Sequence, residues 1–252
     1  MSSLAEWNAP DTVAQAPKSL LGRIIAVFDA VKESDGCASI TDIAVRTRLP
    51  KSTVSRLVTE LTGQRYLART DEGIVLGLRL FELGARASLP RRLIGAAAPV
   101  IRNLRETTGE RVVLWIQQGD DMVSLAAVPG RLPTLPTVAG MRSPALTTAS
   151  GKAYLAFCDD QRIVNRISAP LVAVAARRFR EELTHVRAAA VAMDIEMSYP
   201  GIAAVASPVL SPDRVVLGAI SLAGPSDGMD PHSVAPLVRA ASSNVMRRLA
   251  AA

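Results

Sequence analysis

Cysteine and histidine are scarce in this 252-residue sequence, which contains two of each. Cys37 and Cys158 lie in different predicted domains and show no CxxC spacing, so neither a disulfide framework nor a zinc site is indicated. His185 and His232 lie in different predicted elements, and the chain has no GxSxG nucleophile motif. We therefore expect no metal, no cofactor and no catalytic residues, and we expect that the protein is not an enzyme.

Long apolar runs and a secretion signal are also missing. No uninterrupted apolar stretch could cross a bilayer, and the segment before Ser19 lacks the basic start and apolar core of a signal peptide. We therefore expect a cytoplasmic protein without a membrane partner. Hydrophobic residues make up 49% of the chain, enough for the cores of two domains. The net charge of +6 suits a polyanionic partner, but by itself it indicates only nonspecific attraction.

A helix that could read DNA is predicted over residues 51–62. Its apolar residues recur at the spacing of one helical face, which predicts a buried stripe of Val54, Leu57, Val58 and Leu61. The opposite face carries short polar side chains and one guanidinium, namely Ser52, Ser55, Arg56 and Thr59. A face of this kind can enter the major groove, where an arginine fork reads guanine.

The flanking segments complete a winged helix-turn-helix. Thr41 is the predicted N-cap of a short preceding helix, and Pro50 forces Leu49 out of the helical conformation between the two helices. Residues 66–69 and 74–76 alternate like strands around a polar turn, which predicts the hairpin called the wing.

Positive charge is concentrated on this motif. Between Ile43 and Thr70 six basic residues face a single acid, Glu60. The alternative is a small helical bundle whose basic residues are merely solvated, because residues 1–90 as a whole are nearly neutral. The local concentration favours double-stranded DNA as the partner. The predicted DNA-binding residues are Thr41, Lys51, Ser52, Thr53, Ser55, Arg56 and, on the wing, Arg69.

Composition and periodicity divide the chain into four segments. We predict a mobile tail at residues 1–17, a winged helix-turn-helix domain at 18–78, a linker helix at 79–90 and a second domain at 91–252. The first helix of the DNA-binding domain is predicted from Leu21, Ile24, Ile25, Phe28 and Val31.

The second domain alternates strands and helices. Residues 111–117 and 122–128 form a predicted hairpin, and residues 202–209 and 215–222 form a second strand pair. A long amphipathic helix between the pairs is predicted from Phe179, Leu183, Val186, Ala190 and Met193. The fold class is therefore α+β, an antiparallel sheet flanked by helices.

The last helix has a strong start signal. Asp230 is its predicted N-cap and Pro231 its first residue. Its predicted inner face consists of Val234, Leu237, Val238, Ala241 and Val245.

Residues 129–147 show no sustained period, and apolar loops of this length often act as functional lids. The hydroxyl-rich residues 147–152 follow, and they lead into a helix whose N–H groups could hold an anion such as a carboxylate. Plain helix capping by Thr148 or Ser150 explains these residues equally well. A phosphate-binding loop is excluded, because Leu146 occupies the position where its glycine is required.

Several motifs in order resemble the isocitrate-lyase-regulator (IclR) family of bacterial transcription factors from about Ser19 to Leu249. They are LPKSTVSRLV at 49–58, LG at 76–77 and 83–84, TASGKAYLA at 148–156, residues 194–201, ASPV at 206–209 and ISLAGP at 220–225. The resemblance implies an N-terminal winged helix-turn-helix and a C-terminal effector-binding domain similar to the GAF and PAS sensor folds. It also implies a homodimer or dimer of dimers on a palindromic operator.

The resemblance assigns the effector pocket to Met141, Thr148, Asp194, Ala204 and Ser221. Relatives often carry a cysteine where this chain has Ala204, a serine at Ala223, a histidine at Leu146 and a second acid at Met197. Because each change removes a polar group, we hypothesise an effector that is larger or less polar than a two- or three-carbon acid, such as an aromatic or fatty carboxylate.

The predicted function is therefore sequence-specific transcription regulation, as repressor or activator, with operator affinity controlled by a small organic-acid or aromatic effector. Two alternatives stay open. One is a regulator that has lost ligand control, and the other is an enzyme with an accessory DNA-binding domain.

Overall fold

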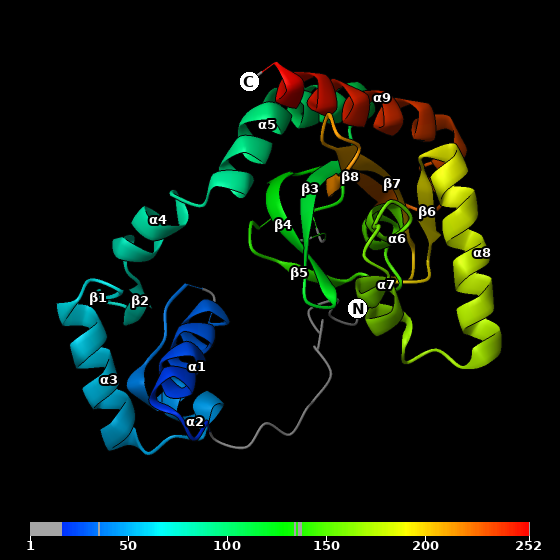
Figure 1. The fold of residues 1–252 in the computed structure, drawn as a ribbon. Helices are drawn as coiled ribbons and strands as arrows, with labels where there is room; N and C mark the ends of the chain where they lie inside the picture. The colour runs from blue at the N-terminus through cyan, green and yellow to red at the C-terminus, as the bar shows by residue number, and fades with distance from the viewer. Residues whose placement is uncertain (1–16, 35, 134, 136–137, 252) are drawn as a thin grey trace. The chain divides into compact units, whose positions relative to one another are not determined.

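A computed structural model describes residues 17–34, 36–133, 135 and 138–251 (Figure 1). The described residues divide into two compact units, with the boundary between Ser88 and Leu89. The tail predicted at residues 1–17 lies outside the described residues, except for Pro17. Within the described ranges, no helix is both long enough and apolar enough to span a membrane.

The N-terminal unit has the order helix, helix, helix, hairpin, helix. Its elements are α1 (Leu20–Lys32), α2 (Ile40–Thr47), α3 (Lys51–Gly63), β1 (Leu67–Arg69), β2 (Ile74–Leu76) and α4 (Leu78–Gly84). The two strands pair antiparallel, with Leu67 opposite Leu76. The predicted winged helix-turn-helix is therefore confirmed.

The start of α2 differs from the prediction. Ser39, not Thr41, is the N-cap: its hydroxyl accepts from the Asp42 backbone N–H at 3.1 Å, and the Asp42 carboxylate accepts from the Ser39 N–H at 3.1 Å. This reciprocal capping box satisfies two N–H groups at once, so the helix begins before Thr41. The hydrogen bond from the Ser39 side chain also lowers the pKa of Asp42.

The core of the N-terminal unit forms around α3. The predicted stripe of Val54, Leu57, Val58 and Leu61 is buried, as expected. The prediction for α1 was partly wrong, because Leu21 and Ile25 are exposed. The buried stripe of α1 instead consists of Val27, Ala30 and Val31.

The C-terminal unit is an antiparallel sheet with helices. Its helices are α5 (Ser88–Thr108), α6 (Ala149–Leu155), α7 (Gln161–Ser168), α8 (Ala173–Ala189) and α9 (Pro231–Ala250). Its strands are β3 (Arg111–Gln118), β4 (Asp121–Val128), β5 (Arg142–Pro144), β6 (Ala192–Ile195), β7 (Ile202–Leu210) and β8 (Val216–Pro225). They form one six-stranded sheet in the order β5-β4-β3-β8-β7-β6. Both predicted strand pairs are present.

Alternation along the strands gives this sheet two buried faces. On β3, Val112 and Leu114 belong to the cluster that includes α5 and α9, whereas Val113 and Trp115 belong to the cluster that includes α6, α7 and α8. Figure 1 shows α5 and α9 together along one side of the sheet. The sheet is thus enclosed between two helical layers, and any cavity on the α6 side is separated from the α9 side by the strands.

Three details of the second unit differ from the predictions. The helix predicted to reach Met193 ends at Ala189, because Ala190 takes a left-handed conformation with φ of 55°, and Met193 lies on β6. Leu237, predicted inside α9, is 39% exposed. The long loop contains the short strand β5, which was not predicted.

The predicted N-cap Asp230 is confirmed by its bonds to the N–H groups of the first turn of α9.

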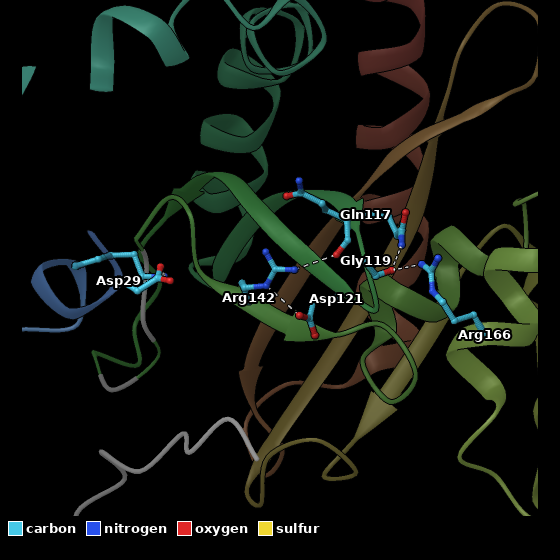
Figure 2. Close-up of polar contacts among 8 residues, drawn as sticks. Asp29, Gln117, Gly119, Asp121, Arg142 and Arg166 are labelled. Carbon is cyan, nitrogen blue, oxygen red and sulfur yellow. Dashed lines mark hydrogen bonds and ion pairs between the residues drawn. The ribbon is translucent and has the colours of Figure 1, made fainter. Parts of the chain in front are cut away.

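Arginine side chains hold the turn between β3 and β4 in place (Figure 2). Arg142 on β5 donates to the Asp121 carboxylate at 2.9 Å and to the Gln118 carbonyl at 3.0 Å. Arg166 on α7 donates to the Gly119 carbonyl at 2.6 Å. These contacts attach β5 and α7 to the same turn, at the edge of the sheet face that α6 covers.

Gly151 on α6 is a strict packing constraint. A Cβ atom there would lie 2.0 Å from the Ala145 carbonyl oxygen, and a backbone atom cannot move aside as a side chain can. Gly151→Ala should therefore lower the free energy of unfolding by about 3 kcal/mol or more, as measured by urea denaturation. Gly95→Ala is the matched control on α5, where a Cβ meets nothing within 4 Å, and it should stabilise the protein by about 0.5–1 kcal/mol. Equal stability of the two variants would contradict this packing.

Candidate functional site

The outer face of α3 is free to contact another molecule. Lys51, Ser52 and Arg56 are exposed, and Thr53 and Ser55 are half-buried. None of these five side chains makes a hydrogen bond or ion pair with another described residue. The face therefore carries donors and a guanidinium that no group of the folded unit uses.

The first turn of α3 is uncapped by any side chain. Its N-cap is Pro50, which offers no side-chain acceptor, although its carbonyl accepts from the Thr53 N–H at 2.9 Å. The backbone N–H groups at Lys51 and Ser52 precede the first helical hydrogen bonds and point along the positive end of the helix dipole. Such an end attracts anions, including phosphate.

The other two predicted DNA-binding residues lie in the same unit. Thr41 is exposed in the first turn of α2, and Arg69 is exposed at the end of β1, opposite Ile74 on the wing. Neither has a side-chain partner among the described residues. Arg46, by contrast, lies 3.8 Å from the Glu33 carboxylate, so part of the positive strip is internally paired.

A second candidate site is a cavity on the α6 face of the sheet. It brings together residues from β3, β5, α6, β6, β7 and β8, including all five effector residues predicted from the resemblance: Met141, Thr148, Asp194, Ala204 and Ser221. The cavity volume is about 50 Å³. This is room for a few water-sized groups and is well below the roughly 300–1,000 Å³ of typical ligand pockets.

Strand register places four of the lining residues in one row. Asp194 on β6 lies opposite Ala204 on β7, Ala204 opposite Ala223 on β8, and Ala223 opposite Arg111 on β3. Directly opposed residues point to the same face of a sheet. The floor of the cavity is therefore a pair of methyl groups with an acid at one end and a base at the other.

Three side chains at the cavity are fixed by hydrogen bonds. Trp115 donates its indole N–H to the Ser221 hydroxyl at 2.8 Å. Thr148 caps α6, since its hydroxyl accepts from the Gly151 N–H at 3.3 Å and donates to the Pro144 carbonyl at 2.7 Å. This supports the capping interpretation of residues 147–152, although Thr148 also lines the cavity.

Asp194 is also held in place. It is 5% exposed, and its Oδ1 accepts from the backbone N–H groups of Met197 at 3.0 Å and Ser198 at 3.3 Å. These bonds close the turn between β6 and β7 and fix the carboxylate at the end of the row.

Arg111 was not predicted as a site residue, yet it lines the cavity and places a guanidinium there. It is 7% exposed, and neither its Nε nor its Nη2 has a hydrogen-bond partner among the described residues. Burial lowers the pKa of Arg111 to about 10, and the facing Tyr199 opposes this shift. The guanidinium therefore remains charged at neutral pH.

The lysine of the TASGK motif has a structural role instead. Lys152 is 1% exposed, and its ammonium lies 2.8 Å from the Glu182 carboxylate on α8. It does not line the cavity, and its charge is neutralised within the unit. No cluster of histidine, cysteine or acidic residues in the described ranges could hold a metal ion.

Comparison with known proteins gives the same relatives for both units. The family described as bacterial transcriptional regulator IclR C-terminal matches residues 89–247, and the IclR helix-turn-helix domain matches residues 20–71. The transcriptional repressor AllR of Klebsiella pneumoniae is 26% identical over 249 residues, covering 94% of this chain and 92% of that protein. The transcriptional repressor IclR of Escherichia coli strain K12 is 25% identical over 237 residues, covering 88% of this chain and 86% of that protein.

Solved structures share the fold. An IclR homolog from Microbacterium hydrocarbonoxydans, complexed with 4-hydroxybenzoate, aligns with a TM-score of 0.81 and 22% identity over 93% of this chain and 100% of that one. The IclR protein of Thermotoga maritima aligns with a TM-score of 0.71 and 22% identity over 91% of this chain and 98% of that one.

Proposed function

The chain belongs to the IclR family of bacterial transcriptional regulators, and we propose that it binds a specific DNA operator with an affinity controlled by a small organic acid. The observation that carries the proposal is the unpaired outer face of α3, in the same chain as an internal cavity with charged ends. The relatives that are repressors support repression as the direction of control. A regulator of the chromosome acts in the cytoplasm, which is the proposed location.

In the proposed complex, the N-terminal half of α3 enters the major groove. Arg56 reads a base edge, while Lys51 and Ser52 contact phosphate beside the uncapped helix end. Thr41, Thr53 and Ser55 add polar contacts, and Arg69 reaches the backbone from the wing. The lack of partners for all seven side chains supports this assignment, because DNA contact breaks no existing hydrogen bond.

The proposed effector binds in the cavity lined by Met141, Thr148, Asp194, Ala204 and Ser221. The 4-hydroxybenzoate complex of the Microbacterium protein supports an aromatic acid as one candidate. A ring exceeds the described volume of about 50 Å³, so binding of such an acid requires the cavity walls to move. Coupling of that movement to operator affinity is typically worth about 1–3 kcal/mol.

A homo-oligomer, dimer or dimer of dimers, is proposed to bind a palindromic operator. Helix α4 supports this, since none of its seven residues is buried. Its side chains Leu78, Phe81 and Leu83 are 69%, 71% and 54% exposed. Exposed apolar groups in such density commonly mark a protein interface.

Arg56 and Arg69 should differ in their effect on DNA binding. The operator is first selected from random duplexes with the wild-type protein. On this operator, Arg56→Ala should weaken the binding free energy by about 1–3 kcal/mol and relax the preference at one base pair. Arg69→Ala should weaken binding to all DNA sequences alike. It should also reduce the slope of the logarithm of the binding constant against the logarithm of salt concentration by about one. Fluorescence anisotropy on a set of single-base variants measures both. Arg180→Ala is the control, because it removes an exposed arginine from α8. Unchanged binding and preference in Arg56→Ala would show that α3 is wrongly placed on the DNA.

Phe81 should control assembly. Phe81→Glu introduces a charge into the exposed apolar side of α4, so it should shift the protein toward the monomer in light scattering and weaken binding to a two-half-site operator. Val215→Glu is the control, since Val215 is 54% exposed in the other unit. If light scattering gives the Phe81→Glu variant the same assembly mass as the wild-type protein, α4 does not form the subunit interface.

Effector control should be visible on the operator. Saturating 4-hydroxybenzoate or benzoate should change operator affinity about 5- to 150-fold in the anisotropy assay, because the coupling free energy is about 1–3 kcal/mol. A response confined to glyoxylate or pyruvate would overturn the preference for a larger acid. An operator complex that ignores every acid would instead support the alternative of a regulator without ligand control.

A further inference from the structure

Arg111 is a buried cation that lacks its counterpart. A guanidinium presents five donors, and buried ones are normally paired with carboxylates, because an uncompensated charge costs several kcal/mol. Here Nε and Nη2 are both inaccessible to solvent and unpartnered, and Arg111 forms no ion pair with any described acid. The lowered pKa of this arginine has the same cause, which is burial without compensation.

None of the neighbouring acids pairs with Arg111. Glu110, the preceding residue, is 2% exposed and pairs through Oε1 with Arg131, while its Oε2 has no hydrogen-bond partner among the described residues. Asp194 lies at the opposite end of the row, three strand spacings away, which separates the two backbones by about 14 Å. The residue directly opposite Arg111 is Ala223, whose methyl group accepts no hydrogen bond.

We propose that Arg111 binds the carboxylate of the effector, so that the cavity selects monocarboxylates whose apolar part lies over Ala204 and Ala223. This rests on the proposed function of the cavity as an effector pocket. The planar guanidinium fork matches a carboxylate with two parallel hydrogen bonds. Tyr199, which also lines the cavity and interacts with Arg111, stands beside the site.

The rest of the cavity restricts the ligand further. Asp194 places a second acid in the same enclosed space, so a dianion such as phosphate or a dicarboxylate meets repulsion at that end. The alanine pair offers only apolar contact between the two charges. A ligand with one carboxylate and an apolar body therefore complements the row in both charge and polarity.

The test compares acids with their uncharged amides. The probes are benzoate, 4-hydroxybenzoate and pyruvate, each beside its primary amide, in the Trp7→Phe background so that Trp115 at the cavity is the remaining tryptophan. At least one acid should bind the wild-type cavity, detected by Trp115 fluorescence and calorimetry, at least tenfold more tightly than its amide. In Arg111→Met the acid should lose at least tenfold in affinity while the amide changes less than twofold.

The unliganded variants provide an independent readout. Arg111→Met removes an uncompensated charge, so its melting temperature without ligand should rise by a few degrees. Arg131→Met is the matched control, because Arg131 does not line the cavity. It leaves Glu110 buried without its partner, so the melting temperature should fall while acid affinity stays unchanged. Arg111→Lys keeps the charge without the fork and should retain part of the acid affinity.

The outcomes separate this proposal from the proposed function. Equal acid affinity in wild type and Arg111→Met, equal affinity for acid and amide, or no acid binding at millimolar concentration overturns the role of Arg111. A melting temperature that falls in Arg111→Met also overturns it, since that would indicate a structural partner. A third outcome is acid binding that depends on Arg111 while operator affinity stays unchanged. This outcome would support the role of Arg111 and would contradict effector control of DNA binding.

Discussion

The register between β6, β7, β8 and β3 is the constraint on which the cavity depends. Asp194, Ala204, Ala223 and Arg111 come from positions far apart in the chain, and only the pairing of four strands aligns them in one row. A shift of one residue in any strand would turn its member of the row toward the opposite helical layer. The same strand pairing directs the apolar side chains into a cluster on each face of the sheet. Strand register therefore determines both the packing of the unit and the residues that line the cavity.

The N-terminal unit meets a different requirement, which is to keep one helical face free of internal partners. The buried stripe of α3 anchors the helix in the core, while the side chains of Lys51, Ser52, Thr53, Ser55 and Arg56 have no hydrogen-bond or ion-pair partner among the described residues. Pro50 contributes to this, because as the N-cap it offers no side-chain acceptor that would occupy the first N–H groups of the helix. One side of α3 therefore fixes the helix in the core, and the opposite side is left exposed for contact with another molecule.

Local patterns were sufficient for most of the fold. The stripe of α3 follows from spacing, and the start of α9 follows from Asp230 and Pro231 in adjacent positions. Errors arose where two local signals competed. Thr41 was predicted as the cap, although Ser39 has an acid three residues later and Thr41 does not. Met193 continued the apolar spacing of α8 past the point where the backbone turns.

The site was less accessible to sequence reasoning. The five predicted effector residues do line one cavity, but they came from resemblance to a family and not from periodicity. Arg111 was missed because its place in the cavity depends on pairing with Ala223, more than a hundred residues away, and the local pattern assigns a face of the strand without showing that this face borders a cavity. Alternation with Val113 and Trp115 was the available signal, since it assigns all three to one face.

The opposition of Arg111 and Ala223 also bears on how such a protein can diverge. A serine at position 223 would bring a hydroxyl beside the guanidinium and compete with any incoming acid, without altering the pairing of β3 and β8. If Arg111 binds the effector as proposed, ligand preference would depend on a position that contributes little volume to the apolar cluster. Duplicated copies of the gene could acquire distinct chemical inputs through single small replacements while the scaffold and its output remain intact.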